Sequence, residues 1–231
     1  MPERNGYGQF CPVSMAAEVF CSRWTPLILR ELLAGTSRFN DLRRGVPRMS
    51  PALLSKRLKD LEKAGIITVA RGKVGAVEYS LTPAGRDLKD VVVGLGLWGS
   101  RWVESQLSLR NLDPTLLMWD MRRRLVPEPL PPRRCTIQFQ YPELASTKQN
   151  YWLVVDGGVV DLCYSDPGFE VDLLVRSPLR TMTAVWMGVA RLRQELDTGA
   201  IEVDGDPALA GAIQQWLGLS PFAREQAKAA A

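Results

Sequence analysis

The stretch that most constrains this chain is SPALLSKRLKDLEKAG, from Ser50 to Gly65, which predicts a single helix with two unlike faces. Ser50 is a favourable N-cap, Pro51 suits the first helical position, and Gly65 is a natural stop after the last turn. At about 100° per residue, one side of this helix is apolar and the other is small and basic. The apolar side carries Leu53, Leu54, Leu58, Leu61 and Ala64, and the outward side carries Ala52, Ser55, Lys56, Lys59 and Lys63.

The outward side suits a recognition helix, because short residues near its start can approach a DNA groove and lysines further along can neutralise phosphates. An ordinary amphipathic surface helix with solvated lysines gives the same pattern, so the surrounding sequence has to decide. Arg57 fits neither face, since by angle it falls within the apolar arc. Its side chain must snorkel, pair with an acid or reach a phosphate.

The charge of the chain is unevenly placed. Residues 23–73 contain 12 Lys or Arg and 4 Asp or Glu, a local balance of +8, whereas the whole chain carries +4 and the remaining residues therefore sum to −4. A basic segment inside an otherwise slightly acidic chain is typical of a nucleic-acid face.

Composition narrows the class of protein. The 231 residues are 46% apolar, which is enough for two modest domains, and no apolar run approaches the roughly 20 residues of a membrane span. Because the first residues, MPERNGYGQF, have no apolar signal core, we expect a cytoplasmic protein. The chain has no histidine, and its four cysteines form no close pair, so we expect no metal site, no disulfide framework and no cofactor. A glycine-rich phosphate loop and a GxSxG elbow are also missing, and we expect that the protein is not an enzyme.

The segments around the recognition helix predict a winged helix-turn-helix. Two short helices are expected within residues 11–35, and a third between Ser37 and Pro47 precedes the recognition helix at helix-turn-helix spacing. Residues 66–71 and 77–81 predict a hairpin with a basic tip, and another helix follows Thr82. The residues expected to contact double-stranded DNA are Arg38, Arg43, Arg44, Ser50, Pro51, Ala52, Ser55, Lys56, Lys59, Arg71 and Lys73.

Four segments carry a family resemblance: CPV at Cys11, RWTPLILRELLAG from Arg23, RFNDLRRGVPRMSPALLSKRLKDLEKAG from Arg38, and EYSLTPAGRDL from Glu78. Over residues 11–102 the chain resembles the HxlR family of bacterial winged helix-turn-helix regulators. The resemblance implies a mainly α domain, with a three-helix core and a β-hairpin wing, in a sequence-specific DNA-binding homodimer. The wing tip, GKVGA, departs from the family because it is shorter and less proline-rich than many, which weakens the expectation of minor-groove contacts.

The resemblance also assigns roles outside the recognition helix. It implies a dimer built by the N-terminal helices and the helix after the wing, where the expected contacts are Val91, Leu95, Trp98 and Trp102. Some family members use the cysteine of the CPV motif as a redox sensor, and Cys11 stands at the matching position. A small buried hydrophobe is the alternative role for such a cysteine.

The second half of the chain predicts an α+β domain. After a proline-rich spacer, CTIQFQY alternates as a half-buried strand, and further strands are expected within residues 151–164 and 170–176. Helices are expected over residues 179–187, 189–197 and 207–217, with a short strand before the last of them. We expect an antiparallel sheet with helices on one side.

The segments WLVVDGGVVDL, EVDLLVRSPLRTMTAVWMG and IEVDGDPALA make residues 112–219 similar to the sterol-carrier-protein domain. That resemblance implies an apolar tunnel that binds a hydrophobic or lipid-like small molecule. The expected wall residues are Ile137, Phe139, Trp152, Val154, Val185, Trp186 and Met187, although plain core packing would also explain them.

The sequence thus predicts a DNA-binding and dimerisation domain over residues 1–110, a sterol-carrier-like domain over residues 111–222 and a tail over residues 223–231. The predicted function is that of a homodimeric transcriptional regulator with a module that senses a hydrophobic small molecule. A lipid carrier that has kept a vestigial winged helix is the alternative, and a regulator that senses redox state through Cys11 is another. Salt-dependent, sequence-specific DNA binding separates a regulator from a carrier.

Overall fold

The computed structural model describes residues 6–72, 75–103 and 109–223. The chain divides into two compact units between Leu95 and Gly96, and each unit has a hydrophobic core of its own. The predicted domain boundary after residue 110 stays a prediction, and the predicted tail beyond residue 223 lies outside the described residues. In the described part of the chain, no helix combines the length and apolar character needed to cross a membrane.

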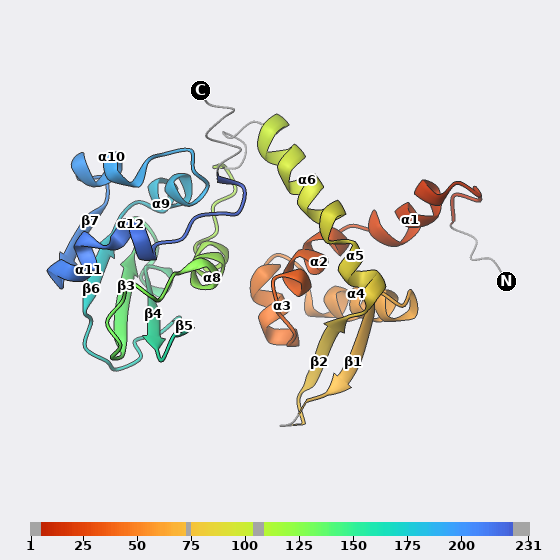
Figure 1. Ribbon diagram of the computed structural model, residues 1–231, viewed down its shortest axis with the longest axis horizontal. Helices are drawn as coiled ribbons and strands as arrows, with labels where there is room; N and C mark the ends of the chain where they lie inside the picture. The colour runs from red at the N-terminus through yellow and green to blue at the C-terminus, as the bar shows by residue number, and fades with distance from the viewer. Residues whose placement is uncertain (1–5, 73–74, 104–108, 224–231) are drawn as a thin grey trace. The chain divides into compact units, whose positions relative to one another are not determined.

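The N-terminal unit has the predicted winged helix-turn-helix fold (Figure 1). Its core is formed by α2, α3 and α4, whose apolar sides meet at Ile28, Leu29, Leu42, Leu54 and Leu58. The elements are α1 (Pro12–Phe20), α2 (Thr25–Leu33), α3 (Phe39–Gly45), α4 (Pro51–Lys63), β1 (Ile67–Arg71), β2 (Val77–Leu81) and α5 (Pro83–Asp87). Helix α6 (Lys89–Trp102) follows, and the division between the two units falls within it.

The C-terminal unit combines helices with a five-stranded sheet of strand order β5-β4-β3-β6-β7. Its elements are α8 (Pro114–Arg124), β3 (Cys135–Gln140), a 3-10 turn η1 (Ser146–Lys148), β4 (Asn150–Asp156), β5 (Val159–Cys163), β6 (Leu173–Arg176), α9 (Leu179–Trp186), α10 (Leu192–Asp197), β7 (Glu202–Gly205), α11 (Pro207–Gly211) and α12 (Ile213–Trp216). The single closing helix expected over residues 207–217 is therefore wrong, because two short helices, α11 and α12, meet at Ala212.

The expected antiparallel sheet is wrong at one strand pair, which makes the sheet mixed. Strand β6 pairs with β3 in parallel, with Ile137 opposite Leu173, while the other neighbouring strands are antiparallel. Strands β5 and β6 therefore run in the same direction, and residues 164–172 lead the chain back along the sheet before β6 begins. The Asp166–Gly168 turn, in which the Gly168 N–H donates to Asp166 Oδ1 at 2.8 Å, belongs to this crossover and not to a hairpin.

One face of the sheet forms the core of this unit. Alternate residues of β3, namely Cys135, Ile137 and Phe139, are fully buried in one apolar cluster with residues of α8, α9, α11 and α12. The cluster includes a buried hydrogen bond of 3.1 Å that the Tyr141 hydroxyl donates to Met118 Sδ. Period-two alternation in β3 thus points one set of side chains at the helices, as the sequence predicted. The expectation of a half-buried strand is wrong, because Thr136 on the other face is also buried and no residue of β3 is exposed.

Candidate nucleic-acid interface

Helix α4 starts as its sequence predicts. The Ser50 hydroxyl accepts a hydrogen bond from the Leu53 N–H at 3.3 Å, and Pro51 occupies the first turn, where a missing N–H is harmless. Leu54, Leu58 and Leu61 are buried in the N-terminal core. The rotational setting of the helix is therefore fixed by its apolar side, which determines what the outward side presents.

The outward side of α4 is an exposed strip of small and basic residues, which we call the α4 strip: Ala52, Lys56, Lys59 and Lys63. These positions recur at spacings of about three to four residues, so they lie above one another on one face. Pro51 and Ser50 are exposed at the start of the helix, and Ser55 is half-buried beside the strip. The arrangement brings together the predicted contacts of this helix on one surface.

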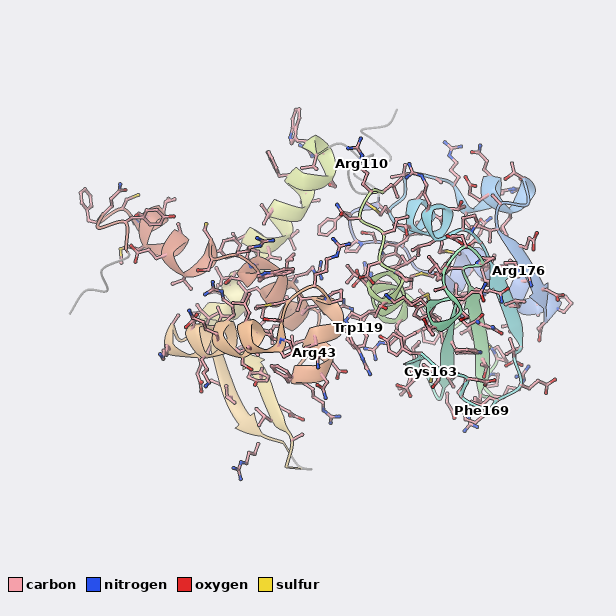
Figure 2. The ribbon with its side chains drawn as sticks, turned by 180° about the vertical axis from the view of Figure 1, so that it is seen from behind. Arg43, Arg110, Trp119, Cys163, Phe169 and Arg176 are labelled. Carbon is pink, nitrogen blue, oxygen red and sulfur yellow. The ribbon has the colours of Figure 1, made fainter. Side chains whose placement is uncertain are left out.

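The basic residues of α3 and of its N-cap differ in whether they form ion pairs within the protein. Arg43, labelled in Figure 2, is exposed on the last turn of α3. Arg44 pairs with Asp41 at 2.9 Å, and the Arg38 guanidinium lies 3.9 Å from the Glu78 carboxylate of β2. Such surface pairs contribute little to stability, so a phosphate can compete for either arginine.

The turn between α3 and α4 is supported from α2. Glu31 is completely buried, and its carboxylate accepts hydrogen bonds from Arg30, which also donates to the Gly45 carbonyl at 2.9 Å. A side chain at Gly45 would collide with the Glu31 carboxylate. This packing holds the end of α3 in place ahead of the recognition helix.

The wing is an antiparallel hairpin whose register runs from Ile67 opposite Leu81 to Arg71 opposite Val77. The Gly72 N–H donates to the Ala76 carbonyl at 2.8 Å, which closes the base of the tip. Arg71 is exposed beside that tip, as a phosphate contact requires. Lys73, the other predicted wing contact, lies outside the described residues.

Arg48, exposed in the turn between α3 and α4, was missed by the sequence prediction. Its signal was available, because it is a further basic residue within the helix-turn-helix itself.

Partial burial raises the pKa of Tyr79 in the wing, and the nearby Glu62 carboxylate raises it further.

The predicted dimer contacts share one side of α6. Val91, Leu95, Trp98 and Trp102 are all exposed and recur at helical spacing. Helix α1 is likewise without a buried residue, and its Val13 and Met15 are exposed. Large exposed apolar residues at regular spacing are typical of a surface that another protein covers.

Cys11 is exposed immediately before α1. Hydrogen bonds from the backbone of Ser14, and more weakly of Val13, lower the pKa of its thiol below the ordinary value. Exposure and a lowered pKa are the two properties that a reactive cysteine needs. Among the described residues, no group of three or more His, Cys, Asp or Glu side chains could hold a metal ion.

The wall residues predicted for a ligand tunnel do not share one face of the C-terminal sheet. Ile137 and Phe139 point into the core together with Val185 and Trp186. Trp152 pairs with Gln138, and Val154 pairs with Thr136, so these two side chains point to the opposite face. The expectation that Trp152 and Val154 face α9 is therefore wrong, because a residue one position along a strand changes face. Met187 follows α9 as its C-cap and is half-buried against the core.

Comparison with known proteins gives the following. A family model described as HxlR-like helix-turn-helix matches residues 19–107. The HTH-type transcriptional regulator YvaP of Bacillus subtilis is 32% identical over 99 residues, covering 42% of this chain and 92% of that protein. YtfH of Escherichia coli, of the same description, is 38% identical over 113 residues, covering 48% and 90%. Among solved structures, the reduced form of the transcriptional regulator YodB from B. subtilis is similar with 29% identity and a TM-score of 0.37, covering 42% of this chain and 98% of that one.

Proposed function

This chain belongs to the HxlR-like helix-turn-helix family of transcriptional regulators, and from that premise we propose that it binds operator DNA sequence-specifically as a homodimer in the cytoplasm. The observation that carries the proposal is the α4 strip. Its Ala52, Lys56 and Lys59 are exposed on a helix whose opposite side is fixed in the core. Small residues at the start of the strip allow close approach to base edges, and the lysines supply charge for the phosphates.

The proposed DNA contacts extend beyond α4 to its neighbours. The proposed contacts are Arg38 at the N-cap of α3, Arg43 and Arg44 on α3, Arg48 in the turn before α4, and Arg71 at the end of β1 in the wing. Together with the local charge balance of +8 in residues 23–73, they support a footprint on the phosphate backbone. The proposal assigns no catalytic role to the chain.

The dimer of the proposal is built by α1 and α6. The exposed stripe of Val91, Leu95, Trp98 and Trp102 supports this assignment, since aromatic and aliphatic side chains are what the centre of an interface uses. A two-fold axis through these helices gives the protein two recognition helices, which must address half-sites about one turn of DNA apart, or a multiple of it.

For the C-terminal unit we propose a sterol-carrier-like module that binds a hydrophobic small molecule. Ile137, Phe139, Val185 and Trp186 belong to one buried apolar cluster between sheet and helices, which is the kind of lining that such a ligand would need. Trp152 and Val154, on the opposite face, are left out of it. If an acyl chain binds there, affinity should rise by about 0.8 kcal/mol per buried methylene until the space is full.

Calorimetric titration of a fatty-acid series, with and without operator DNA, tests this second part. If the ligand regulates DNA binding, it changes the affinity of the protein for the operator by some factor. The operator must then change the affinity of the protein for the ligand by the same factor. No saturable binding across the series would leave the unit as a dimerisation or docking module. Identical curves with and without DNA would make the unit a carrier without regulatory effect.

The first test of the proposal is selection of an operator from random DNA, followed by competition against unrelated DNA at several salt concentrations. We expect specific binding at least about a thousandfold tighter than binding to unrelated DNA, and a steep loss of affinity with salt. Weak retention that is indifferent to sequence would favour the alternative, a lipid carrier with a vestigial winged helix.

Redox sensing through Cys11 is a second candidate function, and it is favoured by one specific observation. The thiol is exposed and its pKa is lowered by backbone hydrogen bonds at the start of α1, a helix that we place in the dimer. Oxidant should then change the operator affinity of the wild-type protein and leave that of Cys11→Ser unchanged. An equal response of both proteins would remove this candidate.

A further inference from the structure

Arg57 is a basic residue of α4 whose side chain is engaged within the protein. Its Nη1 lies 3.1 Å from Asp60 Oδ2, and its Nε donates to the carbonyl oxygen of Arg23 at 3.3 Å. The side chain is 21% exposed. At about 100° per residue, Arg57 lies roughly 130° around the helix from the centre of the α4 strip. The sequence left three possibilities for this side chain: snorkelling, pairing with an acid or reaching a phosphate. In the structure it pairs with an acid, Asp60.

The carbonyl that Arg57 holds belongs to a tight corner between α1 and α2. This corner runs from Cys21, the C-cap of α1, to Trp24, the N-cap of α2. Trp24 has a φ of 78°, which makes it the only non-glycine residue with positive φ in the described part of the chain. A bulky residue persists in this strained conformation only where its surroundings hold it.

Several contacts hold the corner. The Arg23 guanidinium lies over the Trp24 ring, 5.7 Å from its centroid. The Trp24 carbonyl accepts hydrogen bonds from the N–H groups of Leu27 and Ile28, at 3.1 and 3.0 Å. These contacts lie within the corner and α2, whereas the hydrogen bond from Arg57 connects the corner to the recognition helix.

The position of this corner bears on the dimer. Helix α1 packs on the N-terminal core through Val19 and Phe20, near its end; Ser14 and Ala17 are partly buried, and its other residues are exposed. If α1 contributes to the dimer interface, as proposed above, the separation of the two recognition helices depends on how α4 is held relative to α1. That separation must match the distance between DNA half-sites.

We propose that Arg57 is a positioning residue that sets the half-site spacing accepted by the dimer. By binding the Arg23 carbonyl and Asp60 together, its guanidinium fixes α4 to the α1–α2 corner without touching DNA. The inference rests on the proposed function, homodimeric operator binding, and adds to it the residue that determines operator geometry.

The test compares operator spacings. The wild-type protein first selects an operator from random DNA, and versions shortened or lengthened by one base pair at the centre are then prepared. Arg57→Met, Arg57→Lys and Asp60→Asn are compared with the wild type on this series and on a single half-site. Glu62→Gln is the matched control, because it removes the same charge as Asp60→Asn from an exposed position on the same helix.

For Arg57→Met we expect about a tenfold loss of affinity at the native spacing, the effect of losing one charge-assisted hydrogen bond, and a flattened preference among spacings. Half-site affinity and the salt dependence should remain those of the wild type, since no DNA contact is removed. Arg57→Lys should restore part of the preference, because an ammonium group can still donate to the Arg23 carbonyl. Asp60→Asn should also flatten the preference, and Glu62→Gln should keep it.

Two results would overturn the proposal. An unchanged spacing preference in Arg57→Met would show that other contacts set the geometry. The second result concerns the slope of log operator affinity against log salt concentration. If this slope is smaller by about one in Arg57→Met, and if Asp60→Asn binds the operator more tightly than Glu62→Gln does, Arg57 is a phosphate contact. If the wild type selects no operator, the proposed function itself fails before any variant is made. Should Arg57→Met not fold, Arg57→Lys and Asp60→Asn carry the same comparison.

Discussion

Helices α4 and α6 have the same kind of amphipathic sequence and opposite surroundings. In α4 the apolar residues Leu54, Leu58 and Leu61 are 0%, 1% and 2% exposed, whereas in α6 Val91, Leu95 and Trp98 are 49%, 49% and 59% exposed. The apolar side of α4 is covered by its own unit, which leaves a basic strip for a partner of opposite charge. The apolar side of α6 is exposed among the described residues, and a second chain that covered it would gain about 25 cal/mol for each Å² of apolar surface buried.

The largest effect expected from this comparison is on folding. Leu58→Ala should reduce the free energy of unfolding of the N-terminal unit by about 2–5 kcal/mol, because it leaves a cavity among fully buried side chains. Val91→Ala is the matched change on α6 and should alter the stability of the monomer by less than about 0.5 kcal/mol. Denaturant unfolding followed by circular dichroism measures both. Equal losses in the two variants would mean that α6 is covered within the single chain.

The next effect is on assembly. Trp98→Glu places a charge on the apolar side of α6 and should weaken the dimer by about 2 kcal/mol or more, the typical effect of losing a central aromatic contact. Operator affinity should fall with it, because a monomer engages only one half-site. Analytical ultracentrifugation and operator titration give the two numbers. Val159→Glu is the control, since Val159 is similarly exposed on the C-terminal sheet; if it weakens the dimer as much, the interface is not on α6.

A smaller effect is expected at the α4 strip. Lys56→Ala or Lys59→Ala should weaken operator binding by about 1–3 kcal/mol if the lysine contacts a base, or reduce the salt slope by about one if it contacts only phosphate. Lys89→Ala removes an exposed lysine from the start of α6 and should change neither value. Affinity measured at several salt concentrations distinguishes these cases. If both strip variants behave like Lys89→Ala, the DNA-binding face lies elsewhere.

The smallest effect concerns cysteine chemistry at Cys11, immediately before α1. Burial raises the pKa of Cys163, and the Asp161 carboxylate adds to the shift, whereas backbone hydrogen bonds lower the pKa of the exposed Cys11. The thiolate is the reacting form, so near neutral pH Cys11 should be alkylated faster and reach its half-maximal rate at a lower pH than Cys163. Mass spectrometry after timed alkylation reports both rates. Slower reaction of Cys11 in the native protein would indicate that the dimer covers it.

The elements that the sequence predicted well are those whose pattern is local. The N-cap at Ser50 and the buried stripe of Leu54, Leu58 and Leu61 follow from spacing within a single helix. The existence of β3 and the side of it that carries Ile137 and Phe139 follow in the same way, although both faces of the strand are covered. A local pattern, however, does not say whether the apolar side of α6 finds its partner in the same chain. Helical spacing alone therefore does not distinguish Trp98 from Leu58, and only the family resemblance placed Trp98 in a dimer.

The errors arose where distant segments meet. The parallel pairing of β6 with β3 depends on the path of residues 164–172, which the turn at Asp166 does not specify. Trp152 was assigned to the wrong face because its strand register against β3 is a tertiary property. Arg57 had three possible roles, and it pairs with Asp60 on its own helix; its second contact, with the Arg23 carbonyl, joins residues 34 positions apart, and no local pattern indicates it.

The most direct test of the central claim is the mass of the complex between the full chain and its selected operator, measured by native mass spectrometry. We predict two chains of 25.7 kDa on each duplex for the wild type, and loss of this species for Trp98→Glu. One wild-type chain per duplex at saturation would contradict the homodimer. A two-chain complex that forms equally well with Trp98→Glu would contradict the role of α6.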